Sequence, residues 1–327
     1  MTLLGMDNLA LTHTAAYIGG AFAMGLGAIG AATGEGFTAS RASEAIARSQ
    51  ENAGDIIKNM LVGQAISESA FIFSLVIAIL LLFMDISDPG IAKAASLLAA
   101  GLCMGFGAIG SGVGAGIPAG RSCLAIARQP AVSGRITTNM LIGTAVCQTP
   151  AIFAMVVALI LLFKPTGDLA AFPTCAALIG AGLSTGLAAI GSGYGGGMAA
   201  GASCEGVSRQ PETTTAVTTT MLVGQAVAQT PSVFGLLISF VLMFRSFPES
   251  TALSASVGLL SAGLCMGLGG IGPGIGNGMT AEGAVRWVAR RADYAGDLMR
   301  IMLVGQAVSQ STAIYAMVVS LVLIFVV

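Results

Sequence analysis

One segment of this chain occurs four times. Each copy opens with Met-Leu, continues with a Gly and ends in a long run of Leu, Ile, Val and Phe, and the copies are spaced by 80, 81 and 81 residues. They are Met60–Phe83, Met140–Phe163, Met221–Phe244 and Met302–Phe325. A fixed period of this kind indicates an array of one supersecondary unit. The repeat therefore overrides the two soluble domains that a length of 327 residues suggests.

Composition places the repeated units in a membrane. Hydrophobic residues make up 55% of the chain and charged residues 9%. Uncharged runs such as Ser69–Phe83, extended upstream, reach the roughly 20 residues of a membrane-spanning helix. Two such segments in each unit predict an all-α membrane protein of eight transmembrane helices, arranged as four tandem helical hairpins. These hairpins, called units 1 to 4 below, are predicted at residues 10–84, 91–164, 169–245 and 251–327.

The distribution of positive charge predicts the orientation. Of the 14 Lys and Arg residues, 11 cluster at the turns inside the hairpins. The positive-inside rule places those turns in the cytoplasm and, for an even number of spans, both termini outside. We expect an integral protein of the cell inner membrane with no removable signal peptide. The net charge of -1 argues against a nucleic-acid surface.

The two helices of each unit differ in composition. The first is rich in glycine, as in the stretch Gly25–Gly30, which in lipid allows neighbouring backbones to approach closely. The second carries bulky apolar residues, so we expect an inner glycine-rich layer and an outer bulky layer. Three glycine stretches match GxGxxG, but no strand precedes them, which argues against dinucleotide binding. Pro150 and Pro231 predict kinks in two of the second helices.

A polar residue stands at the same register of every second helix. It is a carboxylate in unit 1 and an amide in the others: Glu68, Gln148, Gln229 and Gln310. A carboxylate within an apolar span is costly and indicates a functional site. Glu68 is therefore interpreted as an ion ligand, with a buried acid paired to a neighbouring helix as the alternative. The three glutamines are interpreted as buried amides bonded to neighbouring helices.

Three motifs together resemble the c-type rotor proteins of rotary F-type ATP synthases. They are the glycine-rich first helix, the turn Ala127-Arg128-Gln129-Pro130 and the sequence Gly63-Gln64-Ala65-Ile66-Ser67-Glu68-Ser69. The chain resembles four fused c hairpins of which one keeps the glutamate, a feature also similar to V-type proteolipids. The resemblance implies a non-catalytic subunit whose copies form a two-layered homo-oligomeric rotor ring around membrane lipid.

The resemblance also implies roles for individual residues and partners. Glu68 would bind and release the transported Na+ or H+, opposite an arginine of the stator a subunit. The turns would contact central-stalk subunits through Arg48, Arg128, Gln129 and Arg209. No organic cofactor is implied.

Some positions match sodium-binding members of the family. The Ser69 hydroxyl and the Ile66 carbonyl stand where those members have ligands, and Glu35 replaces their first-helix glutamine. Glu68, Glu35 and Ser69 are therefore predicted Na+ ligands, with a helix-end or structural carboxyl as the alternative for Glu35. Phe73 replaces the tyrosine of many sodium rings, so both ions stay open.

Further amides are predicted as auxiliary to this site. In the family the site straddles neighbouring hairpins, so Glu35 would face an amide of an adjacent unit. The predicted auxiliary residues are Gln64, Gln148, Gln310 and Asn277, the last of which is the counterpart of Glu35 in unit 4.

The number of carboxylates predicts the direction of operation. One Glu68 for every four hairpins means few ions per turn, which favours ATP-driven ion pumping over synthesis. The alternative class is a non-rotary transporter or channel built from repeats. The repeats here are parallel and hairpin-sized, whereas many transporters have inverted repeats and broken helices, so the ring is favoured.

Overall fold

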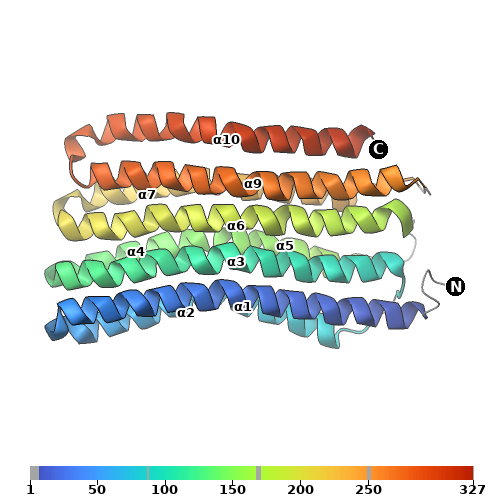
Figure 1. Ribbon diagram of the computed structural model, residues 1–327, viewed down its shortest axis with the longest axis horizontal. Helices are drawn as coiled ribbons and strands as arrows, with labels where there is room; N and C mark the ends of the chain where they lie inside the picture. The colour runs from blue at the N-terminus through green and yellow to red at the C-terminus, as the bar shows by residue number, and fades with distance from the viewer. Residues whose placement is uncertain (1–6, 87, 167–170, 249–251, 327) are drawn as a thin grey trace.

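The computed structural model describes residues 7–86, 88–166, 171–248 and 252–326. It contains eight helical spans that are long and apolar enough to cross a membrane, which confirms the predicted all-α fold of four hairpins. The first helices of the units are α1 (Asn8–Arg48), α3 (Ile91–Arg128), α6 (Ala171–Arg209) and α9 (Leu253–Val288). They lie side by side in chain order, with α1 and α9 at the two ends of the row (Figure 1).

Glycines set the spacing within this row. A Cβ on Gly30 of α1 would lie 2.6 Å from the carbonyl oxygen of Ala108 on α3, and one on Gly193 of α6 would lie 2.5 Å from the carbonyl carbon of Gly110. Only a residue without a side chain allows these backbones to approach so closely. The glycine-rich first helices therefore form the tightly packed layer that the sequence predicts.

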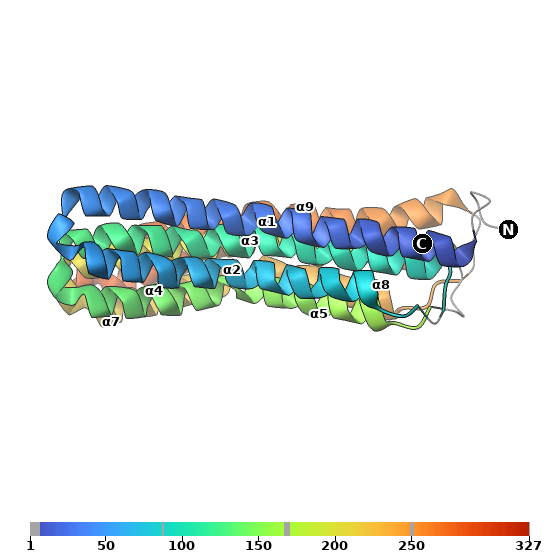
Figure 2. The ribbon, with the colours of Figure 1, turned by 90° about the horizontal axis from the view of Figure 1, so that it is seen from below.

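The second helices form the other layer (Figure 2). Those of the end units are continuous, namely α2 (Ala53–Phe83) and α10 (Ala295–Val326). Those of units 2 and 3 are broken into α4 (Ser133–Cys147) and α5 (Thr149–Phe163), and into α7 (Thr214–Ala228) and α8 (Thr230–Phe244). Short 3-10 turns join the helices of each hairpin, at Gln50–Asn52, Pro130–Val132, Pro211–Thr213 and Ala292–Tyr294. The start of α1 and the end of α10 lie at the end of the bundle opposite these turns.

Prolines explain the two breaks, which lie where the sequence predicts kinks. Pro150 and Pro231 follow the polar position by two residues and lack the N–H that would bond the carbonyl four residues earlier. The carbonyls of Val146 and Val227 are therefore released from the helical ladder. Both carbonyls are used again in contacts between units, as described below.

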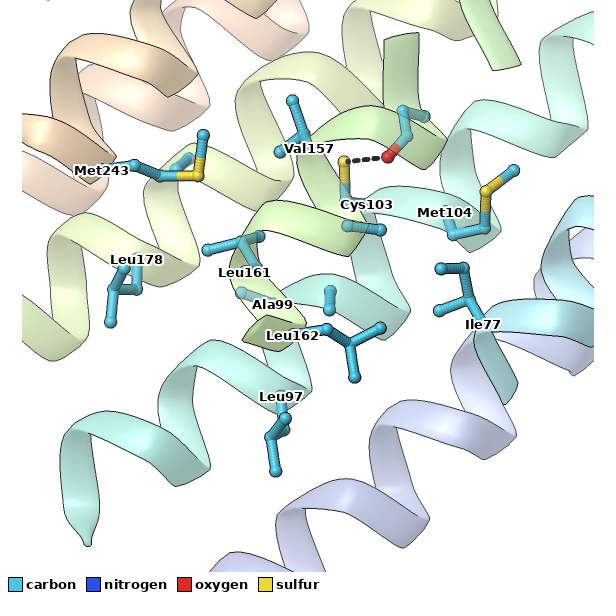
Figure 3. Close-up of a cluster of buried hydrophobic side chains, with 14 of the residues drawn as sticks. Ile77, Leu97, Ala99, Cys103, Met104, Val157, Leu161, Leu162, Leu178 and Met243 are labelled. Atoms are coloured by element: carbon cyan, nitrogen blue, oxygen red, sulfur yellow. Dashed lines mark hydrogen bonds between the residues drawn. The ribbon is translucent and has the colours of Figure 1, made fainter. Parts of the chain in front are cut away.

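Apolar side chains fill the space between the layers near the end opposite the turns. Leu97 and Met104 of α3 pack with Ile77 of α2 and Leu161 of α5, all fully buried (Figure 3). In the same cluster the Cys103 thiol donates to the Ala154 carbonyl at 3.5 Å. The packed interior holds the helices in a fixed register and so fixes the heights of the polar side chains.

Candidate ion-binding site

Glu68 lies in the middle of α2, in unit 1 at one end of the row. In the single chain its side chain is exposed, whereas Glu35, on the neighbouring α1, is half-buried. The two carboxyl groups stand on the two helices of one hairpin. Two carboxylates that approach one another closely there require either a shared proton or a cation between them.

The residues around Glu68 face different neighbours. The Gln64 amide donates to the backbone carbonyl of Glu35 at 3.2 Å, which ties α2 to α1. The Ser69 hydroxyl donates within its own helix to Ala65 at 3.3 Å. The Ile66 carbonyl accepts from the amide of Gln148 in unit 2 at 2.9 Å. The Ile66 carbonyl, predicted as a ligand beside Glu68, therefore already has a partner within the chain.

The Gln148 bond belongs to a pattern that crosses every contact between consecutive units, here called a seam. At the seam of units 2 and 3, Gln229 donates to the Val146 carbonyl at 3.4 Å. At the seam of units 3 and 4, Asn277 donates to the Val227 carbonyl at 3.4 Å and to Oε1 of Gln310 at 2.7 Å. In each seam an amide of the later unit reaches the carbonyl two residues before the polar position of the earlier unit.

A second series of amides, which the sequence analysis missed, crosses two of these seams one turn away, between units 2 and 3 and between units 3 and 4. Gln225 donates to Gly196 of its own unit and to Gly143 of unit 2, both at 3.0 Å. Gln306 donates to Asn277 of its own unit at 3.1 Å and to Gly224 of unit 3 at 2.9 Å. Both are counterparts of Gln64, so the repeat register was the signal that would have identified them.

The same pattern leaves unit 1 incomplete within one chain. Among the described residues, Gln64 donates only to a carbonyl of its own unit and the Glu68 side chain makes no hydrogen bond. The site contains a carboxylate at 68, a second carboxyl at 35 and an amide at 64. Oxygen donors of this kind suit hard cations or a proton.

The four residues predicted to contact the central stalk lie at the hairpin turns. Arg48, Arg128 and Arg209 are exposed, and Gln129 is half-buried. Arg128 donates to the Ser208 hydroxyl of unit 3 at 3.2 Å. The structure thus groups these residues at one end of the bundle, away from Glu68.

The fold defines a membrane protein built from four tandem helical hairpins, of which the first carries a carboxylate in the middle of its second helix. A sequence model for the C subunit of ATP synthase matches each unit, at residues 18–81, 98–161, 179–242 and 260–323. The chain belongs to this ATP synthase C-subunit family, which confirms the resemblance seen in its motifs.

Individual relatives resemble either one unit or several. The ATP synthase c protein of Petrotoga mobilis is 52% identical over 67 residues, which cover 20% of this chain and 70% of the relative. The ATP synthase c protein of Thermotoga maritima is 45% identical over 73 residues, or 22% of this chain and 86% of the relative. The A-type ATP synthase K protein of Methanocaldococcus jannaschii is 32% identical over 199 residues, which cover 60% of this chain and 82% of the relative.

Proposed function

We propose that this chain is the non-catalytic, ion-translocating rotor subunit of a rotary ATPase, in which Glu68 binds and releases one Na+ or H+ as the ring turns. Family membership supports the rotor role. The observation that carries the assignment of Glu68 is the contrast at the repeated polar position. Gln148, Gln229 and Gln310 are buried, whereas Glu68 is ionisable and exposed at the free edge.

Copies of the chain complete the ring at the free edges. Gly36 of unit 1 and Gly272 of unit 4 have nothing among the described residues within 4 Å of a Cβ position. Their counterparts at the in-chain seams, such as Gly116 and Gly191, pack against backbone closer than 3.0 Å. A head-to-tail interface of this type closes into a ring when the rotation per unit allows it. The α10 edge of one copy therefore meets the α2 edge of the next.

Ring closure also completes the ion site. By the repeat, the carbonyl that faces Glu68 is that of Val308 in a second copy, and the hydroxyl is that of Ser311. Val308 is 69% exposed in the single chain, and its carbonyl accepts from Ser311 at 2.7 Å. With Glu35 these groups make an oxygen-rich site. Glu35 and the hydroxyl favour Na+ over H+ as the transported ion, and no organic cofactor is needed.

The partners follow from the two ends and the outer face of the bundle. The turns lie in the cytoplasm of the cell inner membrane by the positive-inside rule, with both termini outside. Their exposed arginines, Arg48, Arg128 and Arg209, contact the central stalk. A stator a subunit presents an arginine to Glu68 as it passes, and membrane lipid fills the ring.

One ion-carrying glutamate per chain favours ATP-driven ion pumping over ATP synthesis. Moving one charge across the membrane is worth about 2.3 kcal/mol per 100 mV, so few ions per turn supply little energy for each ATP made. The same few ions can be driven by ATP hydrolysis against a steep gradient. Robust ATP synthesis by proteoliposomes at ordinary ion-motive force would contradict the pumping role.

Glu68→Gln tests the assignment of the carrier. The change makes unit 1 similar to the other units while keeping the volume, so we expect normal rings that have lost ATP-driven ion uptake in proteoliposomes. Glu51→Gln, in an exposed turn, is the matched control and should pump normally. Uptake that survives Glu68→Gln would refute the assignment and transfer the carrier role to Glu35.

A further inference from the structure

One repeat position near the turns carries a small residue in three of the four first helices. It is Ala45 in unit 1, Ala125 in unit 2 and Gly206 in unit 3, and all three are buried. In unit 4 the same position holds Trp287, the single tryptophan of the chain. The change from the smallest side chains to the largest indicates that this position has a different neighbour in unit 4.

The in-chain seam of units 3 and 4 shows what this position faces. A Cβ on Gly206 would lie 2.8 Å from the Cβ of Ala289, at the end of α9 in the next unit, and 3.5 Å from a methyl group of Val217 on its own α7. The position therefore points across the seam toward the next first helix. Small residues allow the two helices to approach this closely, and an indole does not fit into a seam of the same spacing.

Trp287 stands where the row of first helices ends, on α9 (Figure 1). It is 54% exposed, and the Arg290 guanidinium stacks over its ring at 4.9 Å from the centroid. One turn earlier, Gly283 has nothing among the described residues within 4 Å of a Cβ position. By the repeat, the residue of a second copy that faces Trp287 is Ala47, the counterpart of Ala289, and Ala47 is also exposed.

The residue types at this position are those of an interface anchor. Trp and Arg are enriched among the residues whose truncation costs the most binding energy. The alternative is a tryptophan that holds the chain at the membrane–water boundary. Such a residue would need no position that the repeat turns toward a neighbour, and its exposure would be the same in a single chain and in a ring.

We propose that Trp287 anchors the contact between copies of the chain, with its indole packed against the first helix of the next copy around Ala47. An indole replaces the direct helix contact of the in-chain seams. Near the turns, α9 of one copy and α1 of the next therefore lie further apart than α6 and α9 do within a chain. Each chain contributes three closely packed seams and one wider seam to the ring. The inference rests on the proposed function, because the ring supplies the second copy.

Trp287 is its own probe, since the chain has no other tryptophan. The experiment compares the quenching of its fluorescence by acrylamide, which reaches indoles from water, in intact rings and in chains separated by detergent. We expect quenching to fall several-fold in the ring, because the indole is enclosed there between two first helices. Equal quenching in the two forms would overturn the anchor and would fit a tryptophan at the membrane surface.

A second tryptophan position provides the matched control. Ala131→Trp in a Trp287→Phe background places the indole in the turn of unit 2, at a repeat position that is exposed in every unit. The four residues at this position are Glu51, Ala131, Glu212 and Asp293. Quenching at position 131 should be the same in rings and in separated chains. A decrease as large as that of Trp287 would show that protection does not depend on the seam, and would overturn the anchor.

Truncation measures what the indole contributes to the ring. Trp287→Gly gives unit 4 the residue of unit 3, and the side chain that it removes is half exposed in the single chain, so the fold should be kept. We expect its rings to dissociate at a lower concentration of sodium dodecyl sulfate than wild-type rings. Trp287→Phe, which keeps an aromatic ring, should lose less. Trp287→Gly rings that resist the detergent as well as wild-type rings would overturn the anchor.

Native mass spectrometry of the same samples separates this inference from the proposed function. Rings in which Trp287 is as accessible as in separated chains would overturn the anchor and leave the rotor role intact. A folded chain that forms no ring would overturn both.

Discussion

The seams inside the chain and the free edges use the same helix positions in opposite ways. At an in-chain seam the later unit carries an amide at the polar position. A carbonyl of the earlier unit accepts a hydrogen bond from an amide of the later unit, as in the bond from Gln148 to Ile66. At the free edges the polar position of unit 1 carries Glu68, and Val308, which supplies the matching carbonyl in unit 4, is an exposed residue. The second helices are broken in the interior units and continuous in the end units. Contacts between units of one chain therefore contain neutral amides at these positions, whereas the free edge of unit 1 carries the ionisable group.

The same division holds nearer the turns. Asn59 donates to Ser122 of unit 2 at 2.6 Å and accepts from Thr137 at 2.9 Å, and Asn139 makes the same contacts with Ser203 and Thr218 of unit 3. At the free edges the counterparts are apolar and exposed, with Ile301 on unit 4 and Ile57 on unit 1. At the seam of units 3 and 4 the counterpart Thr220 donates within its own helix instead. Polar bonds near the turns therefore join units 1 to 3, whereas the free edges present apolar side chains at these positions.

The largest expected effect comes from blocking the free edge. Gly36→Leu places a side chain where the counterpart Gly116 packs against backbone, so we expect a folded chain that forms no ring. Native mass spectrometry of the purified protein measures the ring. Gly54→Leu, at the start of α2 and with open space around it, should leave rings intact. A normal ring yield from Gly36→Leu would mean that this face is not the interface between copies.

An intermediate effect is expected at the polar contacts. Asn139→Leu removes two bonds across the seam, which in membranes are worth about 0.6 kcal/mol each, and leaves Ser203 and Thr218 without these partners. The free energy of unfolding should fall by about 1–2 kcal/mol in a denaturant titration. Thr220→Val is the control, because the Thr220 hydroxyl donates within its own helix to Ala216. Equal losses in the two variants would remove the distinction between seam contacts and local ones.

The smallest effect concerns pH at the end opposite the turns. Partial burial raises the pKa of the Asp88 carboxyl. Two hydrogen bonds from Thr166 and the charge of Lys93 together lower it by more than burial raises it, so the pKa lies below its usual range. A carboxyl whose pKa is lower in the folded chain than in the unfolded chain stabilises the fold when the pH is above the unfolded pKa of about 3.9. This stabilisation is lost as the pH falls through the pKa of the folded chain.

Asp88→Asn should therefore destabilise the chain by about 0.2–1 kcal/mol at neutral pH. The difference from the wild type should shrink in melting experiments as the pH falls below about 4. A difference that is constant from neutral pH to about pH 3 would show that the charge of Asp88 does not stabilise the fold.

The sequence predicts the hairpins and the kinks because both depend on local chemistry. Apolar length defines the spans, and Pro150 and Pro231 remove backbone donors wherever they occur. It does not predict that the Ile66 carbonyl meets Gln148, because periodicity gives the height of a residue along a helix but not the direction in which neighbouring helices follow one another. For the same reason Gln225 and Gln306 are recognised as bridges between units only once the row of helices is known.

Glu68 is proposed to carry the ion at a site that a second copy of the chain completes. The most direct test compares carbodiimide labelling of Glu68 in intact rings with that in chains separated by detergent, each with and without sodium. Sodium should slow labelling in the ring and have no effect in the separated chain, where Val308 and Ser311 of a neighbour are missing. Equal labelling with and without sodium in the ring, or equal protection in the separated chain, would rule out Glu68 as a carrier whose site needs a second copy.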